Sequence, residues 1–564
     1  MPLKKRRRNR ITILRWSEFW RGLVRPTGNS QGWSMADAAV VQLPAQGKQG
    51  EEPDGAADKR GDLMQRIRSR QSKELVIGLA GAVGCNLKDV YSQLRRQFEN
   101  FGYDVRLVKI SDIIKDYYKT HPIPPQLSHI KAESLDSLTS SARYKALQDL
   151  GNDIRSTIAP YALATQAIRT ISLERESQLV ANGQDEPPRT VYIVDQLKHP
   201  AEVALFKNVY RNVFYLIGVL SPEEARISQL KQEDMDAVAA QELVERDRNE
   251  NDDCGQKLEK TIQHADFFIR HALGGIQSLT APCERFVGLV HGKNGLTPTV
   301  DEAGMYAAYS ASLKSACLSR QVGASIADSK GNIVSLGWND VPKAGGGLYG
   351  ADDGEGDQRC VHKGGKCQND HHKNRLVEKV VSLIQKELKI DAETARGLSG
   401  KIMQHTPVGS LIEYSRAVHA EMEAILNLAR KKSGTTSGAT LYSTTYPCHN
   451  CARHIIAAGI MRVVYIEPYE KSLATTLHSD AVSKNKSDDH MVVFENFEGV
   501  SPKRYAAFFG GGSDRKDPHG TALHIVSREA NLISTELLDS YIDVESKVVQ
   551  LAVDEFGHPY GGQA

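Results

Sequence analysis

Residues 418–426 read VHAEMEAIL, and residues 444–456 read TTYPCHNCARHII. In these two runs, His419 offers an imidazole nitrogen, and Cys448 and Cys451 offer two thiolates. This set of donors suits a tetrahedral zinc ion. Three protein ligands leave a fourth position open to water, which is typical of catalytic zinc sites and not of structural ones.

Glu421 lies two residues after the histidine and is not needed as a ligand, so its carboxylate is free to move protons. An H-x-E run followed by P-C-x-x-C is the signature of zinc-dependent nucleobase deaminases. The alternative is that the two cysteines are half of a structural zinc knuckle and that the histidine belongs to a core. That alternative leaves Glu421 without a role. We therefore predict a catalytic zinc site in which Glu421 carries protons.

The spacing of the motif residues predicts where two helices begin. Cys448 and Cys451 are three residues apart, so both sulfurs face the same way on the first turn of a helix. Pro447 suits the position just before or at the start of that helix. His419 and Glu421 are only two residues apart and converge only if His419 stands at the entrance of its helix.

The chain around these motifs alternates between helical and extended patterns. Residues 301–318 have helical periodicity, and residues 319–340 alternate like a β-hairpin with a turn at DSKGN. Residues 440–445 and 462–467 read as strands. This order predicts an α/β/α layered domain over residues 296–510.

Several runs in this domain resemble a deoxycytidylate deaminase of the cytidine deaminase superfamily, over roughly residues 300–510. They are SRQVGASI, GWND, HAEMEAIL, YPCHNC and VVYIEPYEKSLATTLHSDAV. The resemblance implies that His419, Cys448 and Cys451 bind zinc and that Glu421 is the proton shuttle. It also implies that Asn339 of GWND contacts the sugar of the substrate. The implied reaction is hydrolytic deamination at carbon 4 of cytosine, which yields a uracil nucleotide and ammonia.

The resemblance is interrupted by an insertion at about residues 343–410. Its polar part reads RCVHKGGKCQNDHHKN from Arg359. One interpretation is a second, structural zinc site made by Cys360, His362, Cys367 and either His371 or His372. The other is a polar loop that happens to carry these residues, and the sequence does not decide between them.

Residues 73–295 alternate strand-like and helical segments, which predicts a doubly wound parallel α/β sheet. The run GLAGAVGCNLKD at residues 78–89 resembles the phosphate-binding loop of P-loop nucleotide kinases. Aligned from Gly81, however, residues 86–88 read Asn-Leu-Lys where G-K-[S/T] would stand, so the lysine and the hydroxyl are out of register. We expect this domain to sense a nucleotide around Gly81, Gly84 and Lys88, or to bind a partner, without phosphoryl transfer. Lys88 is equally interpreted as a surface lysine of the following helix.

The composition bears on nucleic-acid binding, on the cellular compartment and on membrane insertion, and the two terminal segments are assigned separately. A net charge of +2 gives no general argument for nucleic-acid binding, and eight thinly spread cysteines suit a reducing, cytoplasmic compartment. No apolar run approaches the roughly 20 residues that span a membrane. Residues 1–72 read as a basic tail and flexible linker, with Met35 as an alternative start to Met1. Residues 511–564 are assigned to a C-terminal extension.

A chain that joins a P-loop kinase-like domain to a deoxycytidylate deaminase domain resembles the bacterial anti-phage deoxycytidylate deaminases. This resemblance implies action on dCTP and dCMP, a homo-oligomer, and a regulatory inhibitor that is RNA or protein. One alternative is a housekeeping dCMP deaminase that supplies thymidylate. Another is a polynucleotide-editing deaminase, against which the near-neutral charge and the 7% aromatic content argue.

Overall fold

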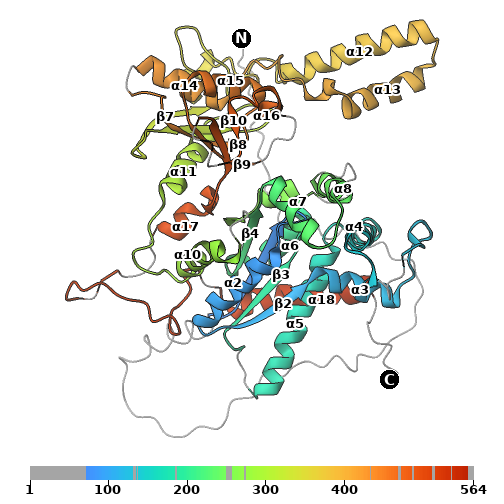
Figure 1. Ribbon diagram of the computed structural model, residues 1–564, viewed down its shortest axis with the longest axis vertical. Helices are drawn as coiled ribbons and strands as arrows, with labels where there is room; N and C mark the ends of the chain where they lie inside the picture. Colours follow the sequence, from blue (N-terminus) through green and yellow to red (C-terminus); the bar gives the residue numbers. More distant parts are fainter. Residues whose placement is uncertain are drawn as a thin grey trace, which may run out of the picture. The chain divides into compact units, whose positions relative to one another are not determined.

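The computed structural model describes residues 71–130, 135, 137–183, 187–248, 257–271, 275–431, 434–467, 472–485, 488, 490–510, 515–516, 518–534 and 536–556 (Figure 1). The chain divides into two compact units, Met1–Asp62 and Leu63–Ala564, and all the described residues belong to the second. The predicted basic tail, its linker and the alternative start at Met35 lie outside the described residues.

The first of two six-stranded sheets has the order β12-β5-β4-β1-β3-β2. Its central strands are continuously apolar, as expected of strands that are covered on both faces. All neighbours are parallel except for β12, which pairs antiparallel with β5. The strands are β1 (Leu75–Gly81), β2 (Asp104–Lys109), β3 (Thr190–Asp195), β4 (Phe214–Leu220), β5 (Phe267–Arg270) and β12 (Gly499–Val500).

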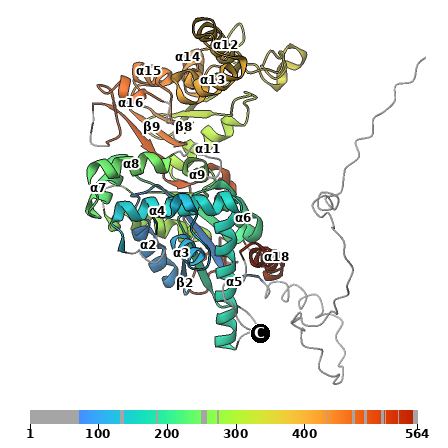
Figure 2. The same cartoon turned by 90° about the vertical axis from the view of Figure 1, so that its right-hand side faces the viewer.

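Helices cover both faces of this sheet. The connection from β1 to β2 runs along the sheet in the opposite direction to the connection from β3 to β4, so right-handed crossovers place α2 and α6 on opposite faces. The sheet is therefore doubly wound, as predicted (Figures 1 and 2). The helices are α2 (Leu87–Asn100), α3 (Ile110–Thr120), α4 (Ser140–Thr157), α5 (Ala162–Asn182), α6 (Pro200–Tyr210), α7 (Glu223–Gln232), α8 (Ala237–Arg248), α9 (Leu258–Ile262) and α10 (Thr280–Val290).

The last helix of the described residues, α18 (Leu538–Phe556), packs along α5, which covers the first sheet. Arg175 on α5 joins the segment before β1 to α18, because it donates to Glu74 at 2.9 Å and to Glu545 at 2.8 Å. The Tyr541 hydroxyl donates to Glu74 at 2.7 Å. All four side chains are buried, so one guanidinium faces two carboxylates away from water, and burial raises the pKa of Glu545.

The second sheet has the order β10-β11-β9-β8-β6-β7. The strands β8, β9, β11 and β10 run parallel to one another, and β6 pairs antiparallel with both β7 and β8. The predicted hairpin is confirmed, with residues 328–332 joining β6 to β7. The strands are β6 (Gly323–Ala327), β7 (Ile333–Trp338), β8 (Thr440–Thr445), β9 (Arg462–Glu467), β10 (Val482–Ser483) and β11 (Val492–Asn496).

Helix α11 (Val300–Ser312) packs on β6, β7 and β8, and α14 (Ala420–Lys431) packs on β6 and β7. Gly323 is required where α11 meets β6, because a Cβ there would lie 1.9 Å from the carbonyl oxygen of Ala308. The inserted segment folds into two helices with a small apolar cluster of their own, around Val377 and Ile402. The remaining helices are α12 (Gln368–Leu388), α13 (Ala392–His405), α15 (His449–Ala457), α16 (Ala474–Leu477) and α17 (Tyr505–Phe509). Short 3₁₀ turns lie at Pro125–Leu127, Arg211–Val213, Ile276–Leu279, Ala351–Gly356, Pro407–Ser410 and Pro502–Arg504.

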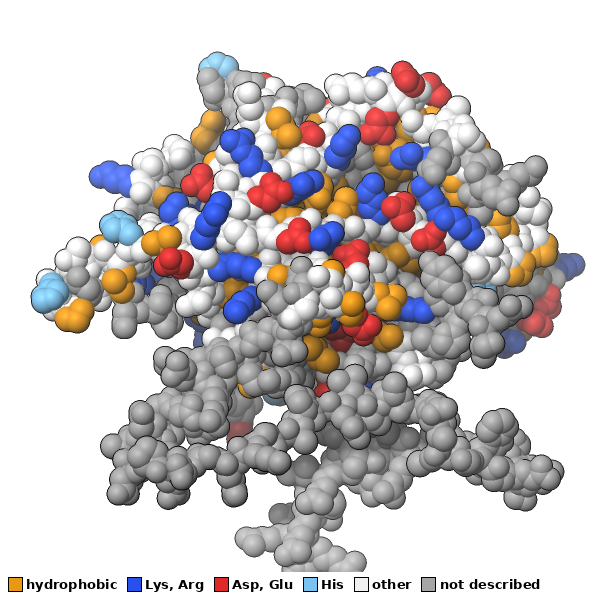
Figure 3. All heavy atoms as spheres, turned by 90° about the horizontal axis from the view of Figure 1, so that it is seen from below, with side chains coloured by type: hydrophobic (Ala, Val, Ile, Leu, Met, Phe, Trp, Pro, Cys, Tyr) orange, Lys and Arg blue, Asp and Glu red, His pale blue; other side chains and the backbone are white. Residues whose placement is uncertain are grey.

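The charged surface is mixed in sign where it can be seen. On the face in Figure 3, Lys and Arg side chains are interspersed with Asp and Glu side chains, which agrees with the small net charge of the chain. Of the helices in the described residues, none is long and apolar enough to cross a membrane.

Candidate active site

His419 stands at the entrance of α14, as the spacing predicts. The helix begins at Ala420, directly after the histidine, and the backbone amide of Glu423 donates to the carbonyl oxygen of His419 at 2.9 Å. Glu421 is therefore in the first turn of the helix. Glu423, two residues further along and also buried, pairs with Arg430, which fits a structural role.

The two cysteines stand at the start of α15, where β8 delivers them. Cys448 is the N-cap residue, and its sulfur accepts a hydrogen bond from the backbone amide of Cys451 at 3.4 Å. Cys451 follows in the first turn, so both sulfurs lie on the same side of the helix start. Pro447 precedes the cap, which confirms the predicted beginning of this helix.

The two helix starts bring three metal-binding atoms together. The Nδ1 atom of His419 lies 3.3 Å from the sulfur of Cys448 and 3.3 Å from that of Cys451. In the described part of the chain, this is the only group of three His, Cys, Asp or Glu donors that all lie within 4.8 Å of one another. The carboxylate of Glu421 reaches the edge of the group, where Oε2 is 3.5 Å from the Cys451 sulfur.

Burial and mutual hydrogen bonds set the charges of this group. The hydrogen bond with Cys451 lowers the pKa of Cys448 to about 4 against the opposing effect of burial. The same hydrogen bond raises the pKa of Cys451. Although burial disfavours a charged imidazole, the hydrogen bond with Cys448 raises the pKa of His419 above its usual value. Burial also raises the pKa of Glu421, so this carboxyl group can hold a proton more readily than an exposed one.

The donor atoms fit a zinc ion. Zinc bonds of about 2.3 Å to sulfur and about 2.0 Å to nitrogen, in tetrahedral geometry, separate neighbouring donors by about 3.5 Å. The separations of 3.3 Å between the His419 nitrogen and the two sulfurs are close to this value. One imidazole and two thiols are also the soft donors that zinc prefers. These three residues could therefore hold a metal ion and leave one side open.

The open side faces a cavity of about 200 Å³, which His419, Glu421 and Cys448 line at one end. The other walls come from the segment before β6, from β7 and β8, and from the insertion. Sequence reasoning missed several lining residues, namely Arg320, Asn369, Thr445 and Tyr446. Thr445 and Tyr446 directly precede Pro447, so their position beside the P-C-x-x-C motif could have indicated that they line the site. Asn369 gave no such signal, because it belongs to the insertion.

Asn339, predicted to contact the sugar of a substrate, lines the same cavity at the end of β7. Its Oδ1 accepts from the backbone amide of Val322 at 2.7 Å, and its Nδ2 donates to the carbonyl oxygen of Arg320 at 2.9 Å. The amide thus fastens the segment that leads into β6. One N–H and one lone pair of the side chain remain beyond these bonds.

Comparison with known proteins places this site in a family. Residues 298–467 match the cytidine and deoxycytidylate deaminase zinc-binding region. The chain is 33% identical over 167 residues to the deoxycytidylate deaminase of Enterobacteria phage T4, covering 29% of this chain and 76% of that protein. It is 31% identical over 165 residues to the enzyme of the same name from phage T2, covering 29% of this chain and 78% of that protein.

This chain belongs to the deoxycytidylate deaminase family. It is a hydrolytic deaminase with the zinc-binding region of that family. A solved structure, the dCMP deaminase of cyanophage S-TIM5 in complex with dCMP and dUMP, is 20% identical with a TM-score of 0.22 and covers 36% of this chain and all of that one. The other residues of the deaminase, including the first sheet and α18, lie outside the segment that matches the family.

No three of the cysteines and histidines of the insertion bring their donor atoms within 4.8 Å of one another, although Cys360 and Cys367 line one small pocket. His362 is exposed and lies 3.3 Å from Asp357, and the ring of His372 lies against Tyr414. The sulfur of Cys360 is 3.8 Å from the guanidinium of Arg416. The polar-loop interpretation therefore describes this segment better than a second zinc site of the predicted ligand set.

The loop that resembles a phosphate-binding loop joins β1 to α2. Gly84 has a φ of 83°, and a Cβ there would lie 2.7 Å from the carbonyl oxygen of Arg226, so close packing against α7 requires glycine. Gly81 is the last residue of β1 and packs on Leu87. Lys88, in the first turn of α2, is exposed beside a second, larger cavity.

Proposed function

We propose that the enzyme deaminates a deoxycytidine nucleotide, dCMP or dCTP, to the corresponding uracil nucleotide with release of ammonia. The observation that carries this proposal is the buried group of His419, Cys448 and Cys451 with the carboxylate of Glu421 beside it, at the end of a cavity. These residues lie within 298–467, which match the cytidine and deoxycytidylate deaminase zinc-binding region, and the phage relatives are named deoxycytidylate deaminase.

In this proposal His419, Cys448 and Cys451 hold zinc, whose positive charge makes a water molecule nucleophilic near neutral pH. Glu421 takes a proton from the attacking water as the oxygen bonds to carbon 4 of cytosine. It passes this proton to ring nitrogen 3. It then takes the remaining proton of the new hydroxyl on carbon 4 and gives it to the exocyclic amine, whose bond to carbon 4 breaks as ammonia leaves. The burial that raises the pKa of Glu421 favours this exchange of protons. We propose that Asn339 donates a hydrogen bond to the sugar of the substrate, using the Nδ2 hydrogen that does not bond to the backbone of Arg320.

The proposal is tested first with Glu421→Ala. We expect deamination to fall to background while the zinc content stays at that of the wild type, because Glu421 moves protons and holds no metal. Glu413→Ala, at an exposed glutamate before α14, is the matched control and should keep full activity. Normal turnover by Glu421→Ala, or loss of its zinc, would contradict the assignment.

The substrate is tested by measuring ammonia release from dCMP, dCTP, CMP and single-stranded DNA in one panel. We expect the deoxycytidine nucleotides to be the best substrates. A preference for single-stranded DNA would instead support a polynucleotide-editing enzyme.

We propose further that the reaction serves anti-phage defence by depleting deoxycytidine nucleotides in the cytoplasm. A homo-oligomer and an RNA or protein inhibitor belong to this proposal, since uncontrolled depletion would harm the host. Cells that carry the wild-type enzyme should lose dCTP on phage infection, and cells that carry Glu421→Ala should not. A dCTP pool that is equally low in uninfected cells would favour the housekeeping alternative. We also propose a nucleotide ligand near Gly81, Gly84 and Lys88 in the first sheet.

A further inference from the structure

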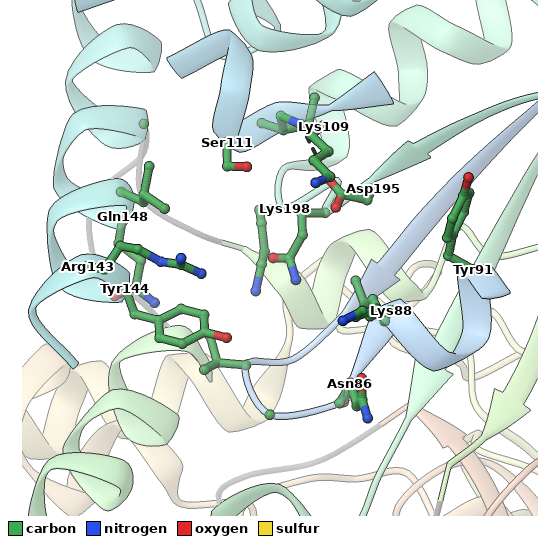
Figure 4. A pocket seen from close by; sticks show the side chains of 18 of the residues that line it. Asn86, Lys88, Tyr91, Lys109, Ser111, Arg143, Tyr144, Gln148, Asp195 and Lys198 are labelled. Atoms are coloured by element: carbon green, nitrogen blue, oxygen red, sulfur yellow. Dashed lines mark hydrogen bonds between the residues drawn. The ribbon is translucent and has the colours of Figure 1, made fainter. Parts of the chain in front are cut away.

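A cavity of about 930 Å³ lies at the carboxyl ends of β1, β2 and β3 (Figure 4). Its walls are the loop at residues 82–86, the first turns of α2 and α3, one face of α4, and residues 195–198 after β3. The chain leaves β1 and β3 in opposite directions along the sheet, so this edge is a topological switch point. In open α/β sheets, ligands bind at such points.

Three cations on different elements face this cavity without an ion-pair partner among the described residues. They are Lys88 on α2, Lys109 at the end of β2 and Arg143 on α4 (Figure 4). The other basic residues that line the cavity are paired, as are Arg155 with Glu202 at 2.9 Å and Lys198 with Asp247 at 2.6 Å. The cavity is also lined by carboxylates, among them Asp195, whose pKa burial raises against the smaller opposing effect of the charge of Lys109. An anion in the cavity would still meet three cations that are not tied up in ion pairs with described residues.

A neutral hydrogen-bonding group faces the same cavity. Gln148, one turn after Tyr144 on α4, is only 6% exposed, and neither its Oε1 nor its Nε2 has a hydrogen-bond partner. A buried primary amide without partners is costly, so it is expected to meet its partners in a ligand or in water. An acceptor beside two donors is complementary to the edge of a nucleobase. The ring of Tyr144, held by its hydroxyl on Glu233 at 3.0 Å, forms an adjoining wall.

The loop itself does not offer its first amide to a ligand. The backbone amide of Val83 donates to Oδ2 of Asp247 at 2.7 Å, and Lys198 donates to Oδ1 of the same carboxylate at 2.6 Å. Asp247 is fully buried, and its carboxylate already accepts the two hydrogens that a bound oxyanion would otherwise accept. A bound phosphate must therefore be held mainly by the cations on the other walls. The lysine nearest the loop amide is already neutralised, so the site suits binding and not phosphoryl transfer.

We propose that this cavity binds a nucleoside phosphate, with its phosphates neutralised by Lys88, Lys109 and Arg143 and its base read by Gln148. This inference deepens the nucleotide ligand proposed for the first sheet and does not depend on the deaminase reaction.

The test is isothermal titration calorimetry of the full-length enzyme with AMP, ADP, ATP, GTP, dTTP and inorganic pyrophosphate. Cytidine nucleotides are left out because the deaminase cavity would take them. We expect at least one nucleotide to bind, and Arg143→Gln and Lys109→Gln each to weaken it about tenfold, as loss of a charge-assisted contact does. The matched control is Lys145→Gln on the same helix, whose lysine pairs with Glu242 outside the cavity, and it should bind like the wild type.

Gln148→Leu tests the base-reading part. It should weaken the nucleotide about tenfold and leave pyrophosphate unchanged, because only the nucleoside meets the amide. Arg143 is exposed, so its substitution tests the site even where a buried change disturbs folding. Three outcomes would overturn the proposal: no binding by any nucleotide, binding that neither charge substitution weakens, or pyrophosphate binding as tightly as the nucleotides.

Discussion

Gly337 in β7 lies directly against the first turn of α14, the helix that carries Glu421. A Cβ at Gly337 would lie 2.2 Å from the carbonyl oxygen of Ala420 and 2.3 Å from the backbone nitrogen of Ala424. Both contacts are with backbone, so no side chain can turn away to make room. Gly337→Ala therefore forces the helix and the strand apart.

The size of this displacement follows from the contacts. Ordinary van der Waals contacts are near 3.5 Å, so α14 has to retreat by about 1 Å. Overpacking of this kind costs about 1–3 kcal/mol of the free energy of unfolding. His419 and Glu421 move with α14, while Cys448 and Cys451 stay on α15, so the two halves of the metal-binding group separate. A misplacement of about 1 Å at a reacting centre can cost about a hundredfold in rate.

We therefore expect Gly337→Ala to lower kcat/KM for dCMP about a hundredfold, to reduce the zinc content and to lower the melting temperature. The matched control is Gly397→Ala in α13, where nothing lies within 4 Å of the new Cβ. That change should leave activity intact and stabilise slightly, since alanine is the better helix former. A Gly337→Ala enzyme with wild-type kcat/KM, zinc content and melting temperature would refute the reasoning.

Three further predictions address the metal, the pH dependence and the buried charges. Cys448→Ala should lose both zinc and activity, because two donors hold the ion poorly; atomic absorption checks this, and a fully metallated variant would show that Cys448 is not a ligand. Burial lowers the pKa of His291 to about 4 from 6.5 in the unfolded chain, so the unfolded state takes up a proton first as the pH falls. The free energy of unfolding linked to this neutral histidine is fully present above about pH 6.5 and falls by up to ~3 kcal/mol as the pH drops from 6.5 to about 4. Urea unfolding at several pH values should show a free energy of unfolding that depends less on pH for His291→Gln than for the wild type, and parallel pH profiles would contradict this. Arg175→Met should cost about 3–5 kcal/mol, because it leaves Glu74 and Glu545 buried without a cation; an unchanged thermal unfolding curve would be evidence against this.

The parts of the site that the sequence predicts well are those that local geometry determines. His419 and Cys448 each stand immediately before a helix, and that position alone aims their ligand atoms. The alternation of strands and helices likewise predicts two α/β sheets, because each pattern is local to its own element.

Contacts between distant segments were not predictable in this way. Val83 meets Asp247 across 164 residues, and Arg175 meets Glu545 across 370 residues. A lone aspartate or glutamate in a helix reads as a solvated charge, and only the tertiary fold reveals its partner. The return of residues 538–556 to the first sheet has the same cause, since the amphipathic pattern of α18 predicts an apolar partner without saying which one.

The insertion shows why spacing predicts a metal site only where regular backbone connects the donors. At Cys448 and Cys451 a helix start fixes both sulfurs on one side. Between Cys360 and Cys367 the backbone runs through a turn with Gly364 and Gly365 at positive φ, so no regular element sets the directions of the donors, although both cysteines line one small pocket with Cys317. Cys367 then caps α12 and, with Asn369, lines the deaminase cavity instead of meeting His362. Residues that suggested a second metal site thus form part of the wall of the first, and any selectivity that the insertion adds should arise from that wall.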